Sequence, residues 1–300
     1  MNLLLTGAWQ GAKENIATLE EMGHCVQFLQ FEKDPLPCEY AWVEGVVCNG
    51  LFLHHDIEKF TNLRYIQLTS AGYDRVPMDY IQSHNITIHN AFGVYSIPMA
   101  EYALWGVLTL YKQGKFFLDN QKQHKWEKHR GLLELSGKTV LILGCGSVGT
   151  ECAKRFEAFG CRVLGIATGA RKQEHFAEVK SMDSLSEMLP CADIVILALP
   201  LTQQTKGLFS AETFQNMKPG SILVNIARGA IVDTEAMITA LNERLYGAVL
   251  DVFEEEPLED SPLWDMENVV LTPHNSFIGE GIRYRLQNKI VESYSESIRE

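Results

Sequence analysis

Short apolar runs separated by longer amphipathic segments dominate the pattern of hydrophobic and polar positions along this chain. Up to about residue 93 the apolar runs have strand length, and they alternate with segments that predict helices around 12–22, 56–61 and 76–83. The five strands predicted in this part cover 3–6, 25–29, 45–48, 65–69 and 86–89. The alternation predicts a small α/β layer domain.

A second regime begins near residue 138, after one long helix predicted over about 97–122. Six runs there predict strands, at 139–143, 162–166, 193–198, 221–226, 247–251 and 268–272. They are rich in Val, Ile and Leu throughout, which is typical of a parallel sheet covered on both faces. Helix-length segments between the runs predict a doubly wound sheet. The tail after about 277 predicts a helix that can pack back on the first domain.

Composition narrows the class of protein. With 46% hydrophobic and 21% charged residues the chain is expected to fold, and no apolar run reaches the ~18 residues of a membrane span. The first residues predict a strand and lack the basic start of a signal peptide. Seven cysteines without a Cys-x-x-Cys pair fit reduced thiols in a cytoplasmic protein that holds no metal. A net charge of −12 disfavours nucleic acid but permits an anionic substrate.

A glycine pattern in the middle of the chain predicts a dinucleotide site. The first run of the second regime ends in Gly144-x-Gly146-x-x-Gly149, and a helix is expected to begin near Ser147. Gly144 permits a tight turn, Gly146 lets the backbone approach a pyrophosphate, and Gly149 lets helix and strand pack closely. The N–H groups of Ser147 and Val148 would then face the phosphates. A glycine turn that binds nothing is the alternative, and the strand–turn–helix context disfavours it.

The end of the second strand bears on which nucleotide binds. An NAD site usually has an acidic residue there for the ribose hydroxyls, but this chain has Ala167 and Thr168, and its first acid is Glu174. Arg171 and Lys172 follow within a turn, and such cations can bind a 2′-phosphate. We therefore predict a preference for NADP(H) over NAD(H). The alternative is that both cations are solvated surface charges.

Three polar residues follow predicted strands of the same sheet and form a candidate catalytic set. Arg228 has the planar fork that suits a carboxylate, and Glu256 and His274 can pair at adjacent strand ends. A carboxylate partner orients an imidazole and favours its protonated form, which makes a proton donor. Each residue taken singly is better explained as a structural or solvated group. Together, beside a dinucleotide site, they indicate a catalytic centre.

With these features the chain resembles the D-isomer-specific 2-hydroxyacid dehydrogenase family, which includes glyoxylate/hydroxypyruvate reductases. The resemblance covers about residues 65–275 in the order of the family. The motifs that carry it begin at Ser70 (Ser-Ala-Gly-Tyr-Asp), Tyr95 (Tyr-Ser-Ile-Pro-Met-Ala-Glu), Gly144, Leu199 (Leu-Pro-Leu-Thr), Asn225 (Asn-Ile-Ala-Arg-Gly), Leu250 (Leu-Asp-Val-Phe-x-x-Glu-Pro) and Thr272 (Thr-Pro-His).

The resemblance implies roles for residues in these motifs. Arg228 would bind the substrate carboxylate, His274 would be the general acid, and Glu256 would be its hydrogen-bonded partner. Asp251 would orient the nicotinamide carboxamide. Backbone N–H groups of the turn formed by Ser70, Ala71 and Gly72 would hold the substrate carboxylate from the other domain. The residues implied to line the cofactor crevice are Leu199, Pro200, Thr205, Ile226 and Ala227.

The resemblance also implies an architecture and an activity. A Rossmann dinucleotide-binding domain (95–276) would be inserted in a smaller flavodoxin-like substrate domain (1–94 and 277–300). The activity would be reversible NAD(P)H-dependent reduction of a small 2-ketoacid to the D-2-hydroxyacid, in a homodimer. A dinucleotide-sensing or corepressor-like protein without significant turnover is the alternative. The basic segment 121–130 around Trp126 is expected to be a solvated loop, with a dimer contact or an attractor for anionic substrate as alternatives.

Overall fold

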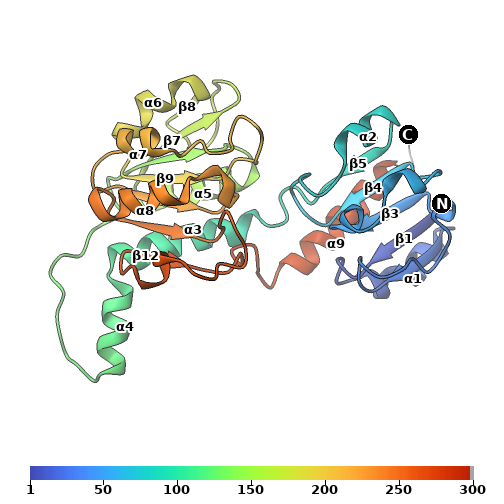
Figure 1. Cartoon of the computed structure of the whole chain (residues 1–300), viewed down its shortest axis with the longest axis horizontal. Coiled ribbons are helices and arrows are strands. Elements are labelled where there is room, and N and C mark those ends of the chain that lie inside the picture. The colour runs from blue at the N-terminus through green and yellow to red at the C-terminus, as the bar shows by residue number, and fades with distance from the viewer. Residues whose placement is uncertain (298–300) are drawn as a thin grey trace. The chain divides into compact units, whose positions relative to one another are not determined.

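A computed structural model describes residues 1–297, and the chain divides into two units (Figure 1). The first unit comprises Met1–Tyr95 together with the chain from Gly279 onward, and the second comprises Ser96–Ile278. Each unit contains one sheet, and all the strand pairs in both sheets are parallel. Within residues 1–297, no helix has both the length and the hydrophobicity of a membrane span.

The sheet of the first unit has the strand order β2-β1-β3-β4-β5, which is the flavodoxin-like order. Its strands are β1 (Asn2–Thr6), β2 (Cys25–Leu29), β3 (Gly45–Cys48), β4 (Tyr65–Leu68) and β5 (Thr87–His89). They match the five predicted strands to within one residue at each end. In the 56–61 segment the structure has only a 3₁₀ turn, Ile57–Lys59, in place of the predicted helix.

Both faces of this sheet are covered. The helices of the first unit are α1 (Ala12–Glu21), α2 (Met78–Ser83) and α9 (Ile282–Ser297). On one face, Leu286 and Ile290 of α9 pack with Leu5, Trp9 and Ala12, so the C-terminal helix returns to the first unit as expected. On the other face, Ile81 of α2 joins a second apolar cluster beneath the 3₁₀ turns.

The sheet of the second unit has the order β12-β11-β10-β9-β6-β7-β8. Its strands are β6 (Thr139–Leu143), β7 (Arg162–Ala167), β8 (Glu178–Ser181), β9 (Ile194–Leu197), β10 (Ile222–Asn225), β11 (Gly247–Leu250) and β12 (Val269–Leu271). The chain order reverses between β6 and β9, which makes this boundary the switch point of a doubly wound Rossmann sheet. Ligands of such sheets bind outside the carboxyl ends of the strands at this point.

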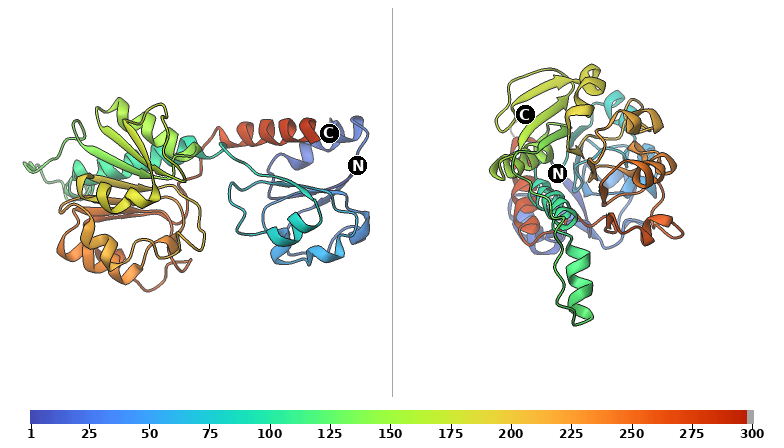
Figure 2. Two further views of the ribbon diagram at one scale, coloured as in Figure 1. Left: turned by 90° about the horizontal axis from the view of Figure 1, so that it is seen from above. Right: turned by 90° about the vertical axis from the view of Figure 1, so that its left-hand side faces the viewer.

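Helices cover both faces of this larger sheet, as Figure 2 shows. The helices of the second unit are α3 (Ser96–Tyr111), α4 (Gly114–Lys122), α5 (Ser147–Ala158), α6 (Leu185–Met188), α7 (Ala211–Asn216) and α8 (Thr234–Glu243). Helices α3 and α5 contribute to one apolar cluster, and α6, α7 and α8 contribute to the other. The near-continuous apolar strands follow from this double coverage.

Two predictions for this unit were incomplete. A seventh strand, β8, pairs with β7 at the sheet edge; its sequence Glu-Val-Lys-Ser is too polar to stand out as a buried run. The long helix predicted over 97–122 is two helices, α3 and α4. The break is at Gln113, which has a left-handed backbone with φ 54° that a continuous helix does not allow.

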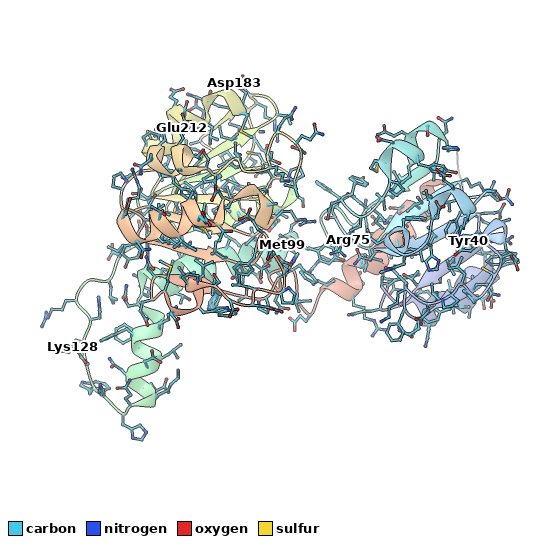
Figure 3. The ribbon with its side chains drawn as sticks, in the orientation of Figure 1. Tyr40, Arg75, Met99, Lys128, Asp183 and Glu212 are labelled. Atoms are coloured by element: carbon cyan, nitrogen blue, oxygen red, sulfur yellow. The ribbon has the colours of Figure 1, made fainter. Side chains whose placement is uncertain are left out.

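After this break, α4 extends away from the remainder of the second unit, and the chain returns through residues 123–134 (Figures 1 and 2). Lys128 lies on this returning segment, well away from the sheet (Figure 3). We call α4 and residues 123–134 the arm. The basic segment noted in the sequence is therefore part of a projecting element and is exposed almost throughout.

Candidate active site

Arg228, Glu256 and His274 all lie at the carboxyl edge of the second unit's sheet. They follow β10, β11 and β12, which are neighbouring strands. Nδ1 of His274 lies 2.8 Å from Oε2 of Glu256, and the two side chains are 35% and 36% exposed. Glu256 is itself oriented by the backbone N–H of Phe253, which donates to Oε1 at 3.0 Å. The pair is thus fixed in position yet accessible to a small molecule.

The backbone at His274 adopts the left-handed region, with φ 51°. This conformation is uncommon outside glycine and marks positions that the surrounding structure must hold. The N–H of His274 donates to the carbonyl oxygen of Asp251 at 2.8 Å and to that of Thr272 at 3.0 Å. The loop that carries the imidazole is therefore tied directly to the end of β11.

Asp251 is fully buried, and its carboxylate binds the same loop. Oδ1 accepts from the Thr272 hydroxyl at 2.5 Å and from the N–H of Asn275 at 2.7 Å, while Oδ2 accepts from the N–H of Ser276 at 2.9 Å. The Tyr102 hydroxyl lies 2.7 Å from that of Thr272. Burial raises the pKa of Tyr102 to about 12, so the phenol keeps its proton at neutral pH. Tyr102 and Thr272 therefore support the site; Thr272 opens one of the sequence motifs, but neither residue was predicted to have this role.

Two buried residues, Asn225 and Gly229, shape the turn that carries Arg228. Oδ1 of Asn225 accepts from the N–H of Ala227 at 3.1 Å, and its Nδ2 donates to the carbonyl of Arg228 at 3.1 Å. A Cβ on Gly229 would lie 1.8 Å from the carbonyl carbon of Phe253. Only glycine therefore permits the Arg228 turn to contact the loop that leads to Glu256. Gly229 belongs to the motif that begins at Asn225, but its close approach to Phe253 is visible only in the structure.

Each of the three motif glycines after β6 is glycine for a different structural reason. Gly144 has φ +100°, and a Cβ there would lie 2.5 Å from the carbonyl oxygen of Ala198. A Cβ on Gly149 would lie 1.9 Å from the carbonyl oxygen of Gly144. Gly146, by contrast, is exposed, and a Cβ there would meet nothing within 4 Å. Packing thus requires Gly144 and Gly149, whereas the space above Gly146 fits the close approach of a pyrophosphate.

Helix α5 begins at Ser147 directly after this turn, as predicted, so the first N–H groups of the helix face the same space. The Ser147 hydroxyl lies 2.6 Å from that of Ser96 at the start of α3. Past the end of β7, both Thr168 and Arg171 are exposed. The Arg171 guanidinium donates through Nη2 to the carbonyl of Cys145, within the glycine turn, at 3.0 Å.

The remaining residues expected to line the cofactor crevice lie mostly in the core. Leu199, Ile226 and Ala227 are 6%, 1% and 7% exposed, so they would offer a cofactor little more than their backbone. Thr205 is also buried, and its hydroxyl donates to the carbonyl of Pro200 at 2.8 Å and accepts from the N–H of Thr202 at 2.7 Å. Thr205 therefore fixes the turn after β9.

The turn of Ser70, Ala71 and Gly72 lies in the first unit, after β4. The carbonyl of Ser70 accepts from the N–H of Ala91 at 2.9 Å, and that of Ala71 accepts from Nδ2 of Asn90 at 2.6 Å. Within residues 1–297, the N–H groups of Ala71 and Gly72 donate to no protein acceptor. Ala71 is exposed and Gly72 is half-buried, so these N–H groups are available to donate to an incoming carboxylate. The described residues contain no cluster of three metal-ligand side chains.

Comparison with known proteins agrees with this geometry. Residues 104–276 match the family described as D-isomer specific 2-hydroxyacid dehydrogenase, NAD binding domain. The chain is 37% identical over 231 residues to a glyoxylate reductase of Pyrococcus furiosus, an alignment that covers 73% of this chain and 69% of the relative.

Solved structures extend the likeness over almost the whole chain. A D-isomer specific 2-hydroxyacid dehydrogenase family protein of Aeromonas salmonicida is 30% identical, with a TM-score of 0.83 over 99% of this chain and 95% of the other. A D-isomer specific 2-hydroxyacid dehydrogenase of Xanthobacter autotrophicus, solved with NADPH and MES, is 27% identical, with a TM-score of 0.78 over 97% and 93%.

Both the matched NAD-binding domain and the glycine turn indicate a nicotinamide dinucleotide as cofactor, and a small hydroxyacid or ketoacid as substrate follows from the family. The chain belongs to the D-isomer specific 2-hydroxyacid dehydrogenase family and is an oxidoreductase of that class.

Proposed function

We propose that this protein reduces a small 2-ketoacid to the D-2-hydroxyacid, reversibly, with His274 as the proton donor. The observation that carries the proposal is the His274–Glu256 pair, whose nitrogen and oxygen lie 2.8 Å apart at the same sheet edge as the glycine turn. A bound reduced nicotinamide would supply the hydride. Metal chemistry is not needed for this step, because an imidazolium can protonate the developing alkoxide.

Protonation is assigned to Nε2 of His274. Because Nδ1 faces Glu256, Nε2 is the ring nitrogen that remains to reach the keto oxygen. The Glu256 carboxylate holds the ring in this orientation. On hydride addition to the keto carbon, the carbonyl oxygen takes the proton and the imidazole is left neutral. In the reverse direction the neutral imidazole accepts that proton.

Substrate binding is assigned to Arg228 and to the Ser70–Gly72 turn. A guanidinium binds a carboxylate through two parallel hydrogen bonds, which orient the neighbouring keto group. Support for the turn comes from the unpaired N–H groups of Ala71 and Gly72. Asp251 is assigned to the nicotinamide carboxamide by family resemblance, and its buried carboxylate also anchors the histidine loop.

The cofactor is proposed to be NADPH in preference to NADH. No acidic side chain stands at the end of β7, where Ala167 and Thr168 occupy the usual position, so nothing there repels a 2′-phosphate. Arg171 lies against the glycine turn and provides a cation at this end of the site. A related structure of the family was solved with NADPH, which is compatible with this preference.

A homodimer is proposed, with an interface formed by the arm and by helix α3, from which the arm continues. Large apolar side chains are exposed there, namely Trp105, Phe117, Leu118 and Trp126, and Trp126 is 97% exposed. Exposed apolar patches of this kind mark association sites. We expect a dimer mass by light scattering, and a monomer for Trp105→Glu. The control is Trp264→Glu, an exposed tryptophan outside the arm. A monomeric wild-type protein would contradict the proposal.

The decisive test of the activity is NADPH and NADH oxidation against glyoxylate, hydroxypyruvate, pyruvate, phenylpyruvate and 2-ketoisocaproate, followed by the absorbance of the reduced nicotinamide. Turnover with any of them, strongly reduced in His274→Asn, supports a reductase. Cofactor binding with no turnover across the panel would instead favour a dinucleotide-sensing protein.

A further inference from the structure

The side chain of Gln173 bridges three groups around the glycine turn. Its Nε2 donates to the carbonyl of Cys145 at 3.0 Å and to the Thr150 hydroxyl at 2.8 Å, and its Oε1 accepts from Nε of Arg171 at 2.8 Å. The Thr150 hydroxyl continues the network by donating to the carbonyl of Gly146 at 2.8 Å. Both ends of the Gln173 amide are therefore used, and the side chain is half-buried.

Arg171 is consequently fixed at two of its nitrogens. Nε donates to Gln173, and Nη2 donates to the carbonyl of Cys145 at 3.0 Å. Its backbone N–H also donates to the carbonyl of Val179 at 3.3 Å, so the segment is held against β8. In the part of the chain that the structure describes, Nη1 has no protein acceptor. The guanidinium thus keeps a donor available while its plane is set by its neighbours.

We propose that Gln173 is a positioning residue for cofactor specificity. By holding the Arg171 guanidinium beside the glycine turn, it presents the remaining N–H groups to a phosphate monoester on the adenosine ribose. The proposal rests on the proposed preference for NADPH. It adds a role for Gln173, an uncharged residue that follows Arg171 and Lys172 in the sequence. Gln173 decides whether Arg171 is held where it can favour NADPH over NADH.

The physical reason is preorganisation. An exposed arginine side chain samples many rotamers, and ordering it on binding costs free energy that weakens the contact. Gln173 and the Cys145 carbonyl hold two of its nitrogens before the cofactor arrives. Because NADH lacks the 2′-phosphate, its binding does not use the Arg171 donor in this way. Loss of Gln173 should therefore weaken NADPH binding and leave NADH binding almost unchanged.

The test measures dissociation constants for NADPH and NADH by fluorescence titration of the intact protein. Gln173→Met keeps the length of the side chain and removes its hydrogen bonds, and we expect NADPH affinity to fall about tenfold, as for one hydrogen bond to a charged group. Gln173→Glu should reduce it further, because a carboxylate repels the phosphate. Lys154→Met, which removes an exposed cation from α5, is the charge control. Melting temperatures show whether each variant folds.

A double-mutant cycle with Arg171→Met separates positioning from general support. If Gln173 acts through Arg171, Gln173→Met should not change the NADPH/NADH affinity ratio further in the Arg171→Met background. Equal weakening of both cofactors would mean that Gln173 only supports the turn, and would overturn the inference. A wild type that prefers NADPH, with the ratio kept in Gln173→Met, would overturn it and leave the proposed function intact. A wild type that prefers NADH would overturn both the inference and the proposed preference for NADPH, but not the proposed reduction of a ketoacid.

Discussion

The backbone N–H of His274 donates to the carbonyl oxygen of Asp251 at 2.8 Å, and the carboxylate of the same aspartate accepts from the N–H groups of Asn275 and Ser276. Three consecutive residues of the histidine loop are thus bound by one buried side chain and its backbone. His274 has a left-handed backbone, which costs a non-glycine residue on the order of 1–3 kcal/mol. Asp251 therefore supplies the hydrogen bonds that make this conformation stable.

Replacement of Asp251 by Asn should loosen this loop. An amide offers only one acceptor atom, so at least one buried N–H of the loop would lose its partner, at a cost of about 1–3 kcal/mol. We expect both a lower melting temperature and a lower kcat. Thr272→Val removes only the hydroxyl at 2.5 Å and should cause a smaller loss of each. Wild-type values for Asp251→Asn would show that other contacts hold the loop.

The proton-donor role is tested by His274→Asn. Asparagine adopts the left-handed region more readily than most residues, so the loop should keep its shape. We expect kcat to fall by ~10²–10⁴, the usual contribution of a general acid, with little change in the dissociation constant for NADPH. Glu256→Gln keeps a polar partner beside Nδ1 and should lose less activity. Near-normal kcat in the histidine variant would contradict its role.

Arg228→Ala should chiefly lower kcat/KM for the ketoacid. If two charge-assisted hydrogen bonds to the carboxylate are lost, the expected decrease is on the order of 10²-fold or more. Cofactor affinity should stay close to that of wild type. The turn itself is held by Asn225, so the melting temperature should change little. An Arg228→Ala enzyme with unchanged kcat/KM would require another residue to bind the carboxylate.

The motif glycines should respond differently to alanine. At Gly149 a Cβ would lie 1.9 Å from a backbone carbonyl, so Gly149→Ala should destabilise the second unit by about 1–3 kcal/mol or more. At Gly146 there is open space and φ is −80°, so Gly146→Ala should fold normally. Its methyl group would instead occupy the space of the pyrophosphate and weaken cofactor binding. Equal melting temperatures for the two variants would contradict this distinction.

Patterns local in sequence predicted most of this structure. The buried strands stand out because both faces of each sheet are covered, and the His274–Glu256 pair follows from two adjacent parallel strands that end at one edge. Strand β8 was not predicted, because an edge strand needs fewer apolar residues than a central one. The break at Gln113 was not predicted either, because the apolar pattern continues across it and only the following Gly114 indicates an interruption.

The supports of the site depended on contacts between distant segments. Tyr102 on α3 meets Thr272 after β12, and no periodicity links residues so far apart along the chain. Gln173 is similar, since its partners Cys145 and Thr150 belong to a turn and a helix that precede it by a whole βα unit. Motifs identify the groups that do chemistry, whereas the residues that hold them are chosen by tertiary packing.

At the opposite, amino-terminal edge of the second unit's sheet, Asp193 joins three elements. Its carboxylate lies 2.7 Å from Nζ of Lys218 and accepts from the N–H of Thr139 at 2.9 Å. Burial opposes the charged form of the carboxylate, but these two hydrogen bonds and the charge of Lys218 outweigh it, so the pKa of Asp193 lies below its ordinary value. This pair is remote from the catalytic edge and can affect only stability.

Because the pKa of Asp193 is lower in the folded state, its contribution to stability is complete above the unfolded pKa of about 3.9 and is lost as the pH falls through the folded value.

Lys218→Met should therefore lower the melting temperature at pH 7. Lys218 is 44% exposed, so we expect at most about 1 kcal/mol, or ~2–4 °C. As the pH falls below about 3.9 the difference from wild type should shrink, because the unfolded chain then takes up a proton that the carboxylate held by Lys218 in the folded protein resists. Lys206→Met, which removes an exposed lysine of the same unit, is the control. A destabilisation of Lys218→Met that stays constant from pH 7 to pH 3 would show that the lysine acts through packing and not through the charge of Asp193.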